Sequence, residues 1–287
     1  MYAIVGTVPD ISFPLTSQPV RAKGDNIQIG NISITISRGT PALIAAAVKV
    51  GEVLDLELPT AFLIGDIGKG DGSGKLYAFL ARELKEYQFS ALCFHYLQPD
   101  VDGHYRVLEG VFSMCRRPKL IADAGFMYAA KMSGQSDEYD LFTPDIGELA
   151  FLADEDAPHP FYTRGFISRE EKKAPWLIER AYRHNNAARY LLVKGEKDYV
   201  AQEGKILDVI EYPKTEALEA IGGTGDTLTG IVTALIASGM PIGKASRIAA
   251  RTNRFAGYYA LPSPASQISS IIPYIPKSLE ESLKKER

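Results

Sequence analysis

The hydrophobic and polar positions along the chain predict short strands that alternate with amphipathic helices. Apolar side chains recur at three- and four-residue steps over residues 41–50 and 77–84, the first segment with Thr40 as N-cap and Pro41 at position N1. Apolar, partly β-branched runs that predict strands buried on both faces of a sheet occupy residues 4–5, 32–36, 61–64, 120–122 and 190–193. This alternation favours a mostly parallel sheet with helices on both sides.

The most regular helical pattern lies late in the chain. Gly239 and Pro241 close it, and its apolar residues repeat at helical spacing at Leu228, Ile231, Val232, Leu235 and Ile236. The helix is therefore expected to begin just after Gly225-Asp226. Residues 199–209 predict an antiparallel hairpin that turns at Glu203-Gly204, beside the parallel sheet.

Two polar segments are expected to lie at the surface. Residues 137–171 are interrupted by Pro158, Pro160 and Gly165, so part of this segment should form a loop. Residues 277–287 predict a short solvated helix that frays at its end. The length of the chain favours a single domain, which we expect over residues 1–287.

Composition narrows the class of protein. The chain has 287 residues, 46% hydrophobic and 23% charged, as is typical of soluble globular proteins. A formal net charge of −3 argues against a nucleic acid or an anionic membrane as partner, and no segment is apolar enough to span a membrane. The N-terminus favours a strand over a signal peptide, and Cys93 and Cys115 form no CxxC, so a reducing, cytoplasmic location is expected. The four histidines lack paired metal-ligand spacing, which argues against a zinc site.

Three glycines and a carboxylate stand at the start of the late helix, in Gly222-Gly-Thr-Gly-Asp-Thr-Leu-Thr-Gly230. Glycines allow the backbone to approach a phosphate closely, and the unpaired N–H groups of a first helical turn point at it. Asp226 is unexpected there, because a carboxylate repels a phosphate. It is suited to act as the general base for an attacking hydroxyl, or it caps the helix; the motif alone leaves both open.

This segment resembles the GxGD signature of ribokinase-like kinases, and its longer form is most similar to the GGSGDVLAG segment of the ADP/ATP-dependent NAD(P)H-hydrate dehydratases. Four further segments, three before this motif and one after it, occur in the order that they have in that family. They resemble its VLDADAL, TPHxGE, LKG and ASDLIxxLP segments, and they lie at residues 120–125, 143–148, 192–195 and 265–276. The resemblance covers residues 118–276.

The resemblance implies an α/β fold, the ribokinase-like three-layer sandwich with a mostly parallel central sheet. It implies ATP or ADP as the nucleotide, with Mg²⁺. Asp226 would be the base, Glu148 would organise Mg²⁺ through water, and Asn253 is a candidate for the adenine side. The nucleotide and its phosphates would be bound by Gly222, Gly223, Thr224, Gly225, Lys194 and Gly195.

The reaction implied is phosphoryl transfer to a small molecule. In the dehydratases the phosphoryl group goes to the C6 hydroxyl of a hydrated nicotinamide ring, phosphate then leaves, and NAD(P)H is restored. A sugar or vitamin-precursor kinase would stop after the first step, and an inactive nucleotide-binding protein would perform neither. Because the dehydratases are often oligomeric, a homo-oligomer is one expected assembly.

Candidate contacts to the phosphoryl acceptor are Gly65, Asp66, Gly68, His95, Asp123 and Asp145. The glycine run 65–74 occupies the place of the family's GPGLG loop and either binds substrate or forms a flexible turn; its spacing fits neither a P-loop nor a Rossmann site. His95 follows an apolar run, and it is either a substrate contact or a structural residue. Asp145 stands where the family has His, and it is either a substrate contact or a turn residue.

Overall fold

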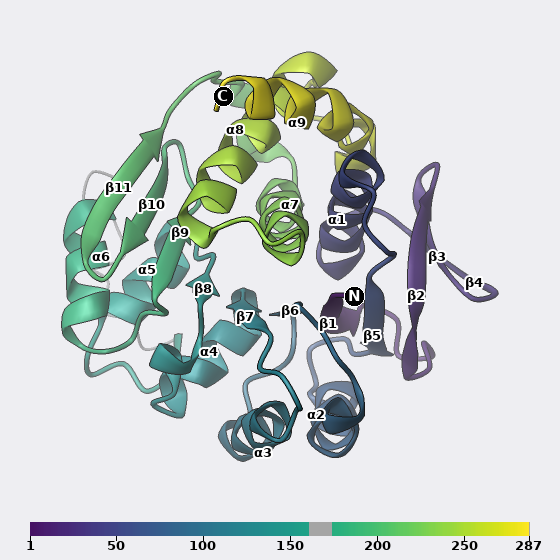
Figure 1. Ribbon diagram of the computed structural model, residues 1–287, viewed down its shortest axis with the longest axis vertical. Coiled ribbons are helices and arrows are strands. Elements are labelled where there is room, and N and C mark those ends of the chain that lie inside the picture. The colour runs from purple at the N-terminus through teal and green to yellow at the C-terminus, as the bar shows by residue number, and fades with distance from the viewer. Residues whose placement is uncertain (161–173, 287) are drawn as a thin grey trace.

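The computed structural model describes residues 1–160 and 174–286 of the chain (Figure 1). In these residues the strands join into one sheet, in the order β11-β10-β9-β8-β7-β6-β1-β5-β2-β3-β4. The strands are β1 Ala3–Val8, β2 Thr16–Lys23, β3 Asn26–Ile29, β4 Ile32–Thr35, β5 Thr60–Gly65, β6 Ala91–Phe94, β7 Lys119–Ala122, β8 Leu141–Phe142, β9 Tyr190–Val193, β10 Asp198–Gln202 and β11 Lys205–Ile210.

The centre of the sheet is parallel and its two ends are antiparallel. Strands β9, β8, β7, β6, β1 and β5 run parallel to one another. At one end β2, β3 and β4 are antiparallel additions, and they project to the right in Figure 1. At the other end β10 and β11 form the predicted hairpin that turns at Glu203-Gly204. The mostly parallel α/β sheet and this hairpin are therefore confirmed.

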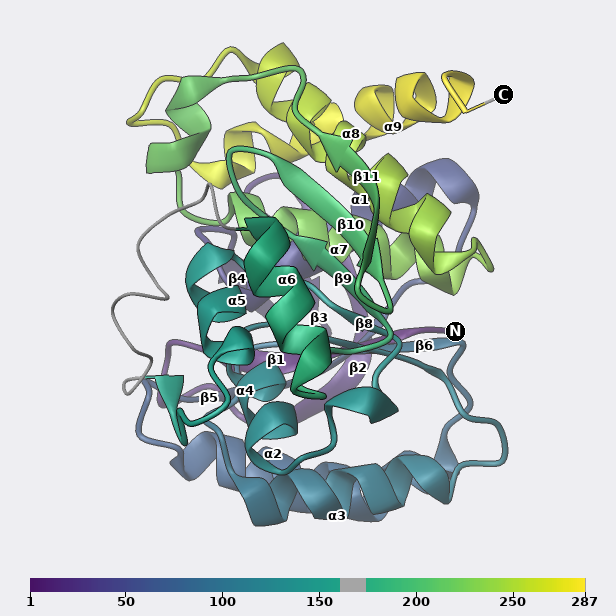
Figure 2. The same cartoon turned by 90° about the vertical axis from the view of Figure 1, so that its left-hand side faces the viewer.

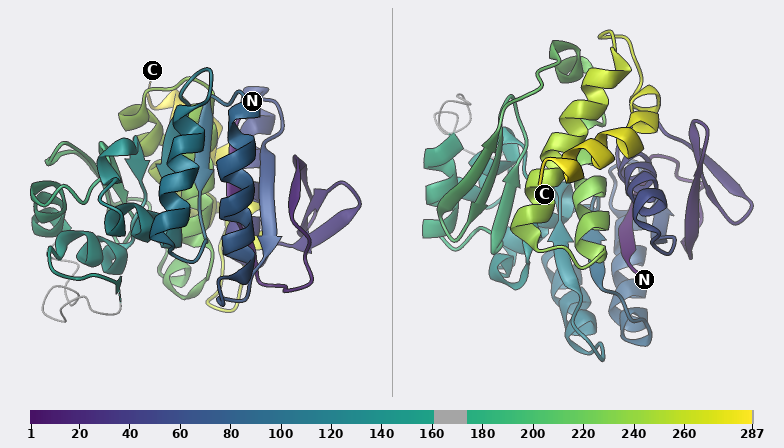
Figure 3. Two further views of the ribbon diagram at one scale, coloured as in Figure 1. Left: turned by 90° about the horizontal axis from the view of Figure 1, so that it is seen from below. Right: turned by 45° about the horizontal axis from the view of Figure 1, so that its top comes forward.

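Helices cover both faces of the sheet, as Figures 2 and 3 show from the side, from below and from above. The upper layer in Figure 1 holds α1, α7, α8 and α9, and the lower layer holds α2, α3 and α4. Helices α5 and α6 share the core of the lower layer and lie at the left of the figure, beside β9–β11. The helices are α1 Thr40–Leu54, α2 Asp71–Glu83, α3 Val101–Phe112, α4 Ala124–Met132, α5 Ile146–Ala153, α6 Ala174–Arg183, α7 Thr224–Ala237, α8 Ile242–Ala260 and α9 Ile275–Lys284.

Strand β1 shows why the central strands are apolar throughout. Successive side chains of a strand point to opposite faces, so Ile4 packs into the core under α1 and α7, whereas Ala3 and Val5 pack into the core under α2 and α3. All three side chains are fully buried. A strand between two helical layers needs apolar residues at every position, which is why the sequence shows runs and not alternation here.

Two predicted elements differ from the structure in detail. The strand expected at residues 32–36 is β4, but its side chains alternate between partly buried and exposed, because it pairs only with β3 at the end of the sheet. Thr40, expected as the N-cap of α1, is its first residue; Gly39 is the N-cap, with φ of 68°. The Thr40 side chain is buried in the interior.

One further expectation needs correction, and another is tested only in part. The segment expected to be a solvated, fraying helix at residues 277–287 begins within α9, whose Leu279 is fully buried in the same core as α1 and α8. The segment 137–171 holds strand β8 and helix α5, while residues 161–173 of it lie outside the described residues. In the part of the chain that the structure describes, no helix is long and apolar enough to cross a membrane.

A buried histidine in the lower core gives stability a predicted pH dependence. His104 lies with Nε2 2.8 Å from the Tyr139 hydroxyl and Nδ1 3.0 Å from the Ser133 hydroxyl, and burial lowers its pKa to about 4. The unfolded chain binds a proton at this ring more readily than the folded protein does. The contribution of the neutral ring to the free energy of unfolding is therefore complete above pH 6.5 and is lost as the pH falls toward 4.

We expect this histidine to account for about 3 kcal/mol of the stability lost between neutral pH and pH 4. Urea unfolding of the wild type and of His104→Gln at pH 7 and pH 4.5 measures it. The variant should lose less stability on acidification than the wild type, and equal losses would contradict the assignment.

Candidate active site

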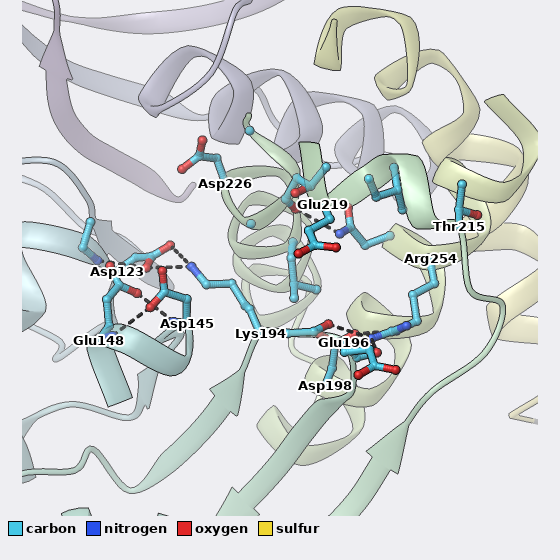
Figure 4. A pocket seen from close by; sticks show the side chains of 18 of the residues that line it. Asp123, Asp145, Glu148, Lys194, Glu196, Asp198, Thr215, Glu219, Asp226 and Arg254 are labelled. Carbon is cyan, nitrogen blue, oxygen red and sulfur yellow. Dashed lines mark hydrogen bonds and ion pairs between the residues drawn. The ribbon is translucent and has the colours of Figure 1, made fainter. Parts of the chain in front are cut away.

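The carboxyl ends of the central strands open into a cleft of about 840 Å³ (Figure 4). Several predicted residues meet there because each one follows a parallel strand: His95 follows β6, Asp123 follows β7, and Lys194 follows β9. Asp145, three residues after β8, is bridged to Lys194 through the backbone. In open α/β sheets this edge is where ligands bind.

Helix α7 presents its N-terminus to the cleft. The N-cap is Gly223, whose φ of 102° suits glycine and whose lack of a side chain leaves the first turn without a side-chain cap. The cleft is lined by Gly223, Thr224, Gly225 and Asp226. Exposed N–H groups and the positive end of the helix dipole make this turn suitable for an anion such as phosphate.

Asn253 on α8 holds that turn from behind. Its amide nitrogen donates to the carbonyl oxygen of Thr224 over 3.0 Å, and its amide oxygen accepts from the Thr227 hydroxyl over 2.8 Å. Asn253 also lines the cleft. The residue considered for the adenine side therefore fixes the shape of the glycine turn.

Asp226 lies in the first turn of α7, and not before the helix as the pattern predicted. Its carboxylate does not cap α7. Oδ2 accepts from the backbone N–H of Gly39 over 2.6 Å, and Oδ1 lies 3.1 Å from Nε2 of His95. Burial alone would raise the pKa of Asp226, but the His95 hydrogen bond, the nearby Lys194 and the Gly39 amide hold it below its usual value. The group is therefore ionised at neutral pH and can accept a proton.

Lys194 forms an ion pair with Asp123 across the floor of the cleft (Figure 4). Its Nζ lies 2.9 Å from both Asp123 oxygens, and Asp123 also accepts from the Thr229 hydroxyl over 2.6 Å. Burial lowers the pKa of Lys194, but the charges of Asp123 and Glu148 outweigh it and raise that pKa above its usual value. The cleft thus contains a fixed positive charge.

Asp145 and Glu148 form a capping box at the start of α5. Asp145 accepts from the Glu148 N–H over 2.7 Å, and Glu148 accepts from the Asp145 N–H over 2.8 Å. Asp145 is thus the helix cap and also lines the cleft. Burial and the nearby Asp123 and Asp145 raise the pKa of Glu148 to about 8, although Lys194 opposes this. A cation that approaches Glu148 would favour its ionised form.

The far wall of the cleft is held by Arg254 of α8. Its guanidinium lies 2.6 Å from Asp198 and donates to the carbonyl oxygens of Gly195, Glu196 and Glu211. Asp198 in turn accepts from the Gly195 N–H over 3.2 Å. These contacts fix the loop after β9, where Gly195 was predicted to lie near the nucleotide.

The glycine-rich run after β5 is placed differently from the other predicted contacts. One Asp66 oxygen accepts from the N–H groups of Gly68, Lys69 and Gly70, and the other accepts from the N–H and hydroxyl of Ser73. The carboxylate is thus fully engaged by its own loop at the start of α2. Gly65, Asp66 and Gly68 do not line the cleft described above, and neither does Gly222.

Sequence reasoning overlooked several residues that shape the cleft. Gly39 precedes α1 and Thr40 begins it. Gly39 contacts Asp226, 187 residues further along the chain, and Thr40 contacts His95, 55 residues further along. Thr229 lies one turn after Asp226 on α7, and Arg254 directly follows Asn253. Helical spacing from the recognised motif could have indicated Thr229, whereas the role of Gly39 depends on tertiary packing.

The comparison with known proteins gives the family. The carbohydrate kinase family model described as NAD(P)H-hydrate dehydratase matches residues 106–275, which is more than half of the chain. The chain belongs to this family. Membership agrees with the resemblance of the glycine motif and its companion segments, and it indicates an enzyme of dehydratase or kinase-like type.

A curated relative and several solved structures extend the similarity beyond the matched region. An uncharacterized protein of Methanocaldococcus jannaschii is 46% identical over 243 residues, which are 84% of this chain and 100% of that protein. A ribokinase-like superfamily protein of Enterococcus faecalis has a TM-score of 0.59 at 12% identity over 98% of this chain and 87% of its own. Phosphofructokinase-2 of Escherichia coli with fructose-6-phosphate has a TM-score of 0.56 at 12% identity, over 98% of this chain and 99% of its own. These structural matches confirm the ribokinase-like fold.

Proposed function

We propose that the protein is a nucleotide-dependent phosphotransferase that acts on a small-molecule hydroxyl, with NAD(P)H-hydrate dehydratase as its specific activity. The observation that carries this proposal is the ionised Asp226 carboxylate at the uncapped N-terminus of α7, in a cleft that also holds Lys194. A phosphate-binding turn with a proton acceptor beside it is what phosphoryl transfer to a hydroxyl requires. The family match supports the dehydratase activity.

The cleft fits a nucleotide of ordinary size. Its phosphates would be bound by backbone N–H groups of residues 223–225, which line the cleft, with Lys194 supplying positive charge. Thr215 and Glu219 lie on the side away from Asp123 (Figure 4). Leu218 and Asn253 also line the cleft, so its lining combines apolar and hydrogen-bonding groups. Such a mixed surface suits a base and a ribose. ATP and ADP both fit this description, so each is a candidate donor.

Glu148 fits a role as an outer ligand of Mg²⁺. Within residues 1–160 and 174–286, no cluster of three or more His, Cys, Asp or Glu side chains is arranged to hold a metal ion. This agrees with Mg²⁺, which usually keeps several waters and arrives with substrate phosphates. When bound, Mg²⁺ would neutralise phosphate charge and polarise the transferred group. Glu148 would orient its water shell.

The chain's own residues account for the transfer step. Asp226 accepts the proton of the acceptor hydroxyl as its oxygen forms a bond to the terminal phosphorus, and the bond from that phosphorus to the bridging oxygen breaks with its electrons on the departing nucleotide. The N–H groups at the start of α7 hold the phosphoryl oxygens throughout. In the dehydratase reaction the C6–O bond then breaks toward phosphate, driven by the ring nitrogen's lone pair, and loss of a C5 proton restores the dihydronicotinamide.

The second candidate is a sugar or vitamin-precursor kinase. It is favoured by Asp145, which stands where the dehydratases have His and which lines the cleft. It also fits the fold shared with phosphofructokinase-2 of Escherichia coli and with a pyridoxal kinase of Staphylococcus aureus, at a TM-score of 0.54 and 12% identity over 90% of this chain and 88% of that one. The third candidate, an inactive nucleotide-binding protein, is disfavoured by the ionised Asp226.

Purified protein incubated with hydrated NADH and either ATP or ADP is expected to restore the absorbance of the dihydronicotinamide ring and to release phosphate. Reactions without nucleotide provide the baseline. Absence of recovery with both nucleotides would reject the dehydratase activity. Consumption of ATP in the presence of a sugar or of a pyrimidine, pyridine or thiazole alcohol would then identify the kinase, and no transfer to any of these acceptors would reject phosphotransfer.

A further inference from the structure

A buried line of hydrogen bonds leads from Asp226 into the protein interior. Nε2 of His95 lies 3.1 Å from Asp226 Oδ1, and Nδ1 of the same ring lies 3.0 Å from the Thr40 hydroxyl. His95 and Thr40 are both fully buried. Burying a polar side chain is unfavourable unless it forms hydrogen bonds. The bonds of Thr40 to His95 and of His95 to Asp226 therefore compensate for the burial of both side chains.

The ionisation of Asp226 decides which atom donates in each bond. An ionised carboxylate can only accept, so Nε2 of His95 carries the hydrogen that is donated to Asp226. In the neutral ring Nδ1 is then an acceptor, and the Thr40 hydroxyl donates to it. Asp226 thus selects the tautomer of the His95 ring, and the Thr40 hydroxyl holds the orientation of the ring by donating to Nδ1.

Among the residues that the structure describes, no other side chain lies at hydrogen-bond distance from Nε2 of His95 to compete with Asp226. Its Nε2 lies 3.9 Å from Asp123 Oδ2, which is too long for a hydrogen bond. The Asp123 oxygens are already bonded to Lys194 and Thr229. The imidazole is therefore committed to Asp226.

The carboxylate of Asp226 is held at both oxygens. His95 donates to Oδ1 and the Gly39 backbone donates to Oδ2, and these two bonds fix the plane of the group. A carboxylate has about four acceptor positions, so positions remain for a hydroxyl in the cleft. The side chain of Asp226 is still 13% exposed, in keeping with access from the cleft.

Gly6 in the middle of β1 leaves room for Thr40. A Cβ at position 6 would lie 2.5 Å from the Thr40 hydroxyl oxygen and 2.7 Å from its methyl carbon. Glycine weakens a strand interior, and it commonly marks a place where another group approaches closely. The sequence of β1 thus accommodates the residue that orients His95.

We propose that His95 is a positioning residue for Asp226, held in place by Thr40, and that Gly6 exists in β1 to admit this arrangement. The inference rests on the proposed phosphoryl transfer, in which Asp226 is the base. His95 would keep the free acceptor positions of the carboxylate directed toward the hydroxyl that loses its proton.

Thr40→Val and Thr40→Ser form the matched test, because valine keeps the shape of threonine and serine keeps its hydroxyl. With the acceptor that supports turnover, Thr40→Val should lower kcat about 10- to 100-fold, while KM for the nucleotide stays unchanged. Thr40→Ser should restore most of the rate. His95→Gln should resemble Thr40→Val, and in an Asp226→Asn background neither change should lower the rate further.

Nitrogen NMR of ¹⁵N-histidine protein gives a readout that does not depend on turnover. The chain has four histidines, and the His95 signals are identified by their loss in His95→Gln. We expect Nε2 to carry the hydrogen in the wild type, and Thr40→Val should shift the signal of Nδ1, because this nitrogen loses the hydroxyl that donates to it. A stable Nδ1–H tautomer in the wild type, or wild-type kcat in Thr40→Val, would overturn the inference.

The outcomes separate this inference from the proposed function. If Asp226→Asn is inactive and Thr40→Val is fully active, only the positioning role fails. If Asp226→Asn keeps the wild-type rate, or if the wild type transfers phosphate to no acceptor, the proposed function fails and the positioning role falls with it.

Discussion

Asp226→Asn is expected to lower the rate of phosphoryl transfer about 100- to 10,000-fold, the range typical for loss of a general base. Asparagine keeps the size of the side chain but cannot accept the hydroxyl proton. The phosphates are held by backbone N–H groups and Lys194, so nucleotide affinity should change little. Steady-state kinetics with the identified acceptor, together with calorimetric titration of ATP or ADP, measures both quantities.

Asp102→Asn is the matched control for this prediction. Asp102 also lies in the first turn of a helix, α3, but it is exposed and pairs with Arg106, well outside the cleft. This variant should keep the wild-type rate. An Asp226→Asn protein as active as the control would remove Asp226 from the mechanism, and loss of nucleotide binding in Asp226→Asn would instead point to a binding role.

Arg254→Met is expected to destabilise the fold by about 3–5 kcal/mol, as is typical when one partner of a buried ion pair is removed. The change leaves the buried Asp198 carboxylate without its guanidinium, and it deprives the carbonyl oxygens of Gly195, Glu196 and Glu211 of a donor. Because Gly195 and Glu196 line the cleft, nucleotide affinity should fall as well. Urea unfolding at neutral pH measures the change in the free energy of unfolding.

Arg106→Met provides the comparison for Arg254→Met, since Arg106 forms an exposed ion pair with Asp102 on the surface of α3. Its loss should cost no more than about 1 kcal/mol. Adding Asp198→Asn to Arg254→Met should recover part of the lost stability, because the unpaired buried charge is then removed. Equal stability of the two arginine variants would show that water replaces the guanidinium.

The central sheet could be predicted from the sequence because strands between two helical layers are apolar at every position. Ile4 and Val5 illustrate this, since each is buried in a different core. β4 was predicted less well, because the run of isoleucines looks like a buried strand, whereas the strand lies at the end of the sheet with one neighbour. Hydrophobicity along the chain reports burial on average and does not report position within a sheet.

In the candidate site, too, some features could be predicted from the sequence and others could not. Residues that follow parallel strands, such as His95, Asp123 and Lys194, could be predicted to meet, because parallel strands end at one edge of the sheet. The glycine run 65–74 met the same criterion, but Asp66 binds the loop's own N–H groups. Local hydrogen bonds of this kind cannot be inferred from composition.

The sequence by itself determined the α/β class, the glycine turn at the start of α7 and the presence of Asp226 in it, because these depend on local spacing and on the chemistry of single residue types. Only the tertiary structure decided what Asp226 does there. Its carboxylate turns away from capping α7 and bonds to Gly39 and His95, which are 187 and 131 residues away along the chain. Contacts at such separations arise from the packing of α1 and β6 against α7, and no local pattern encodes them.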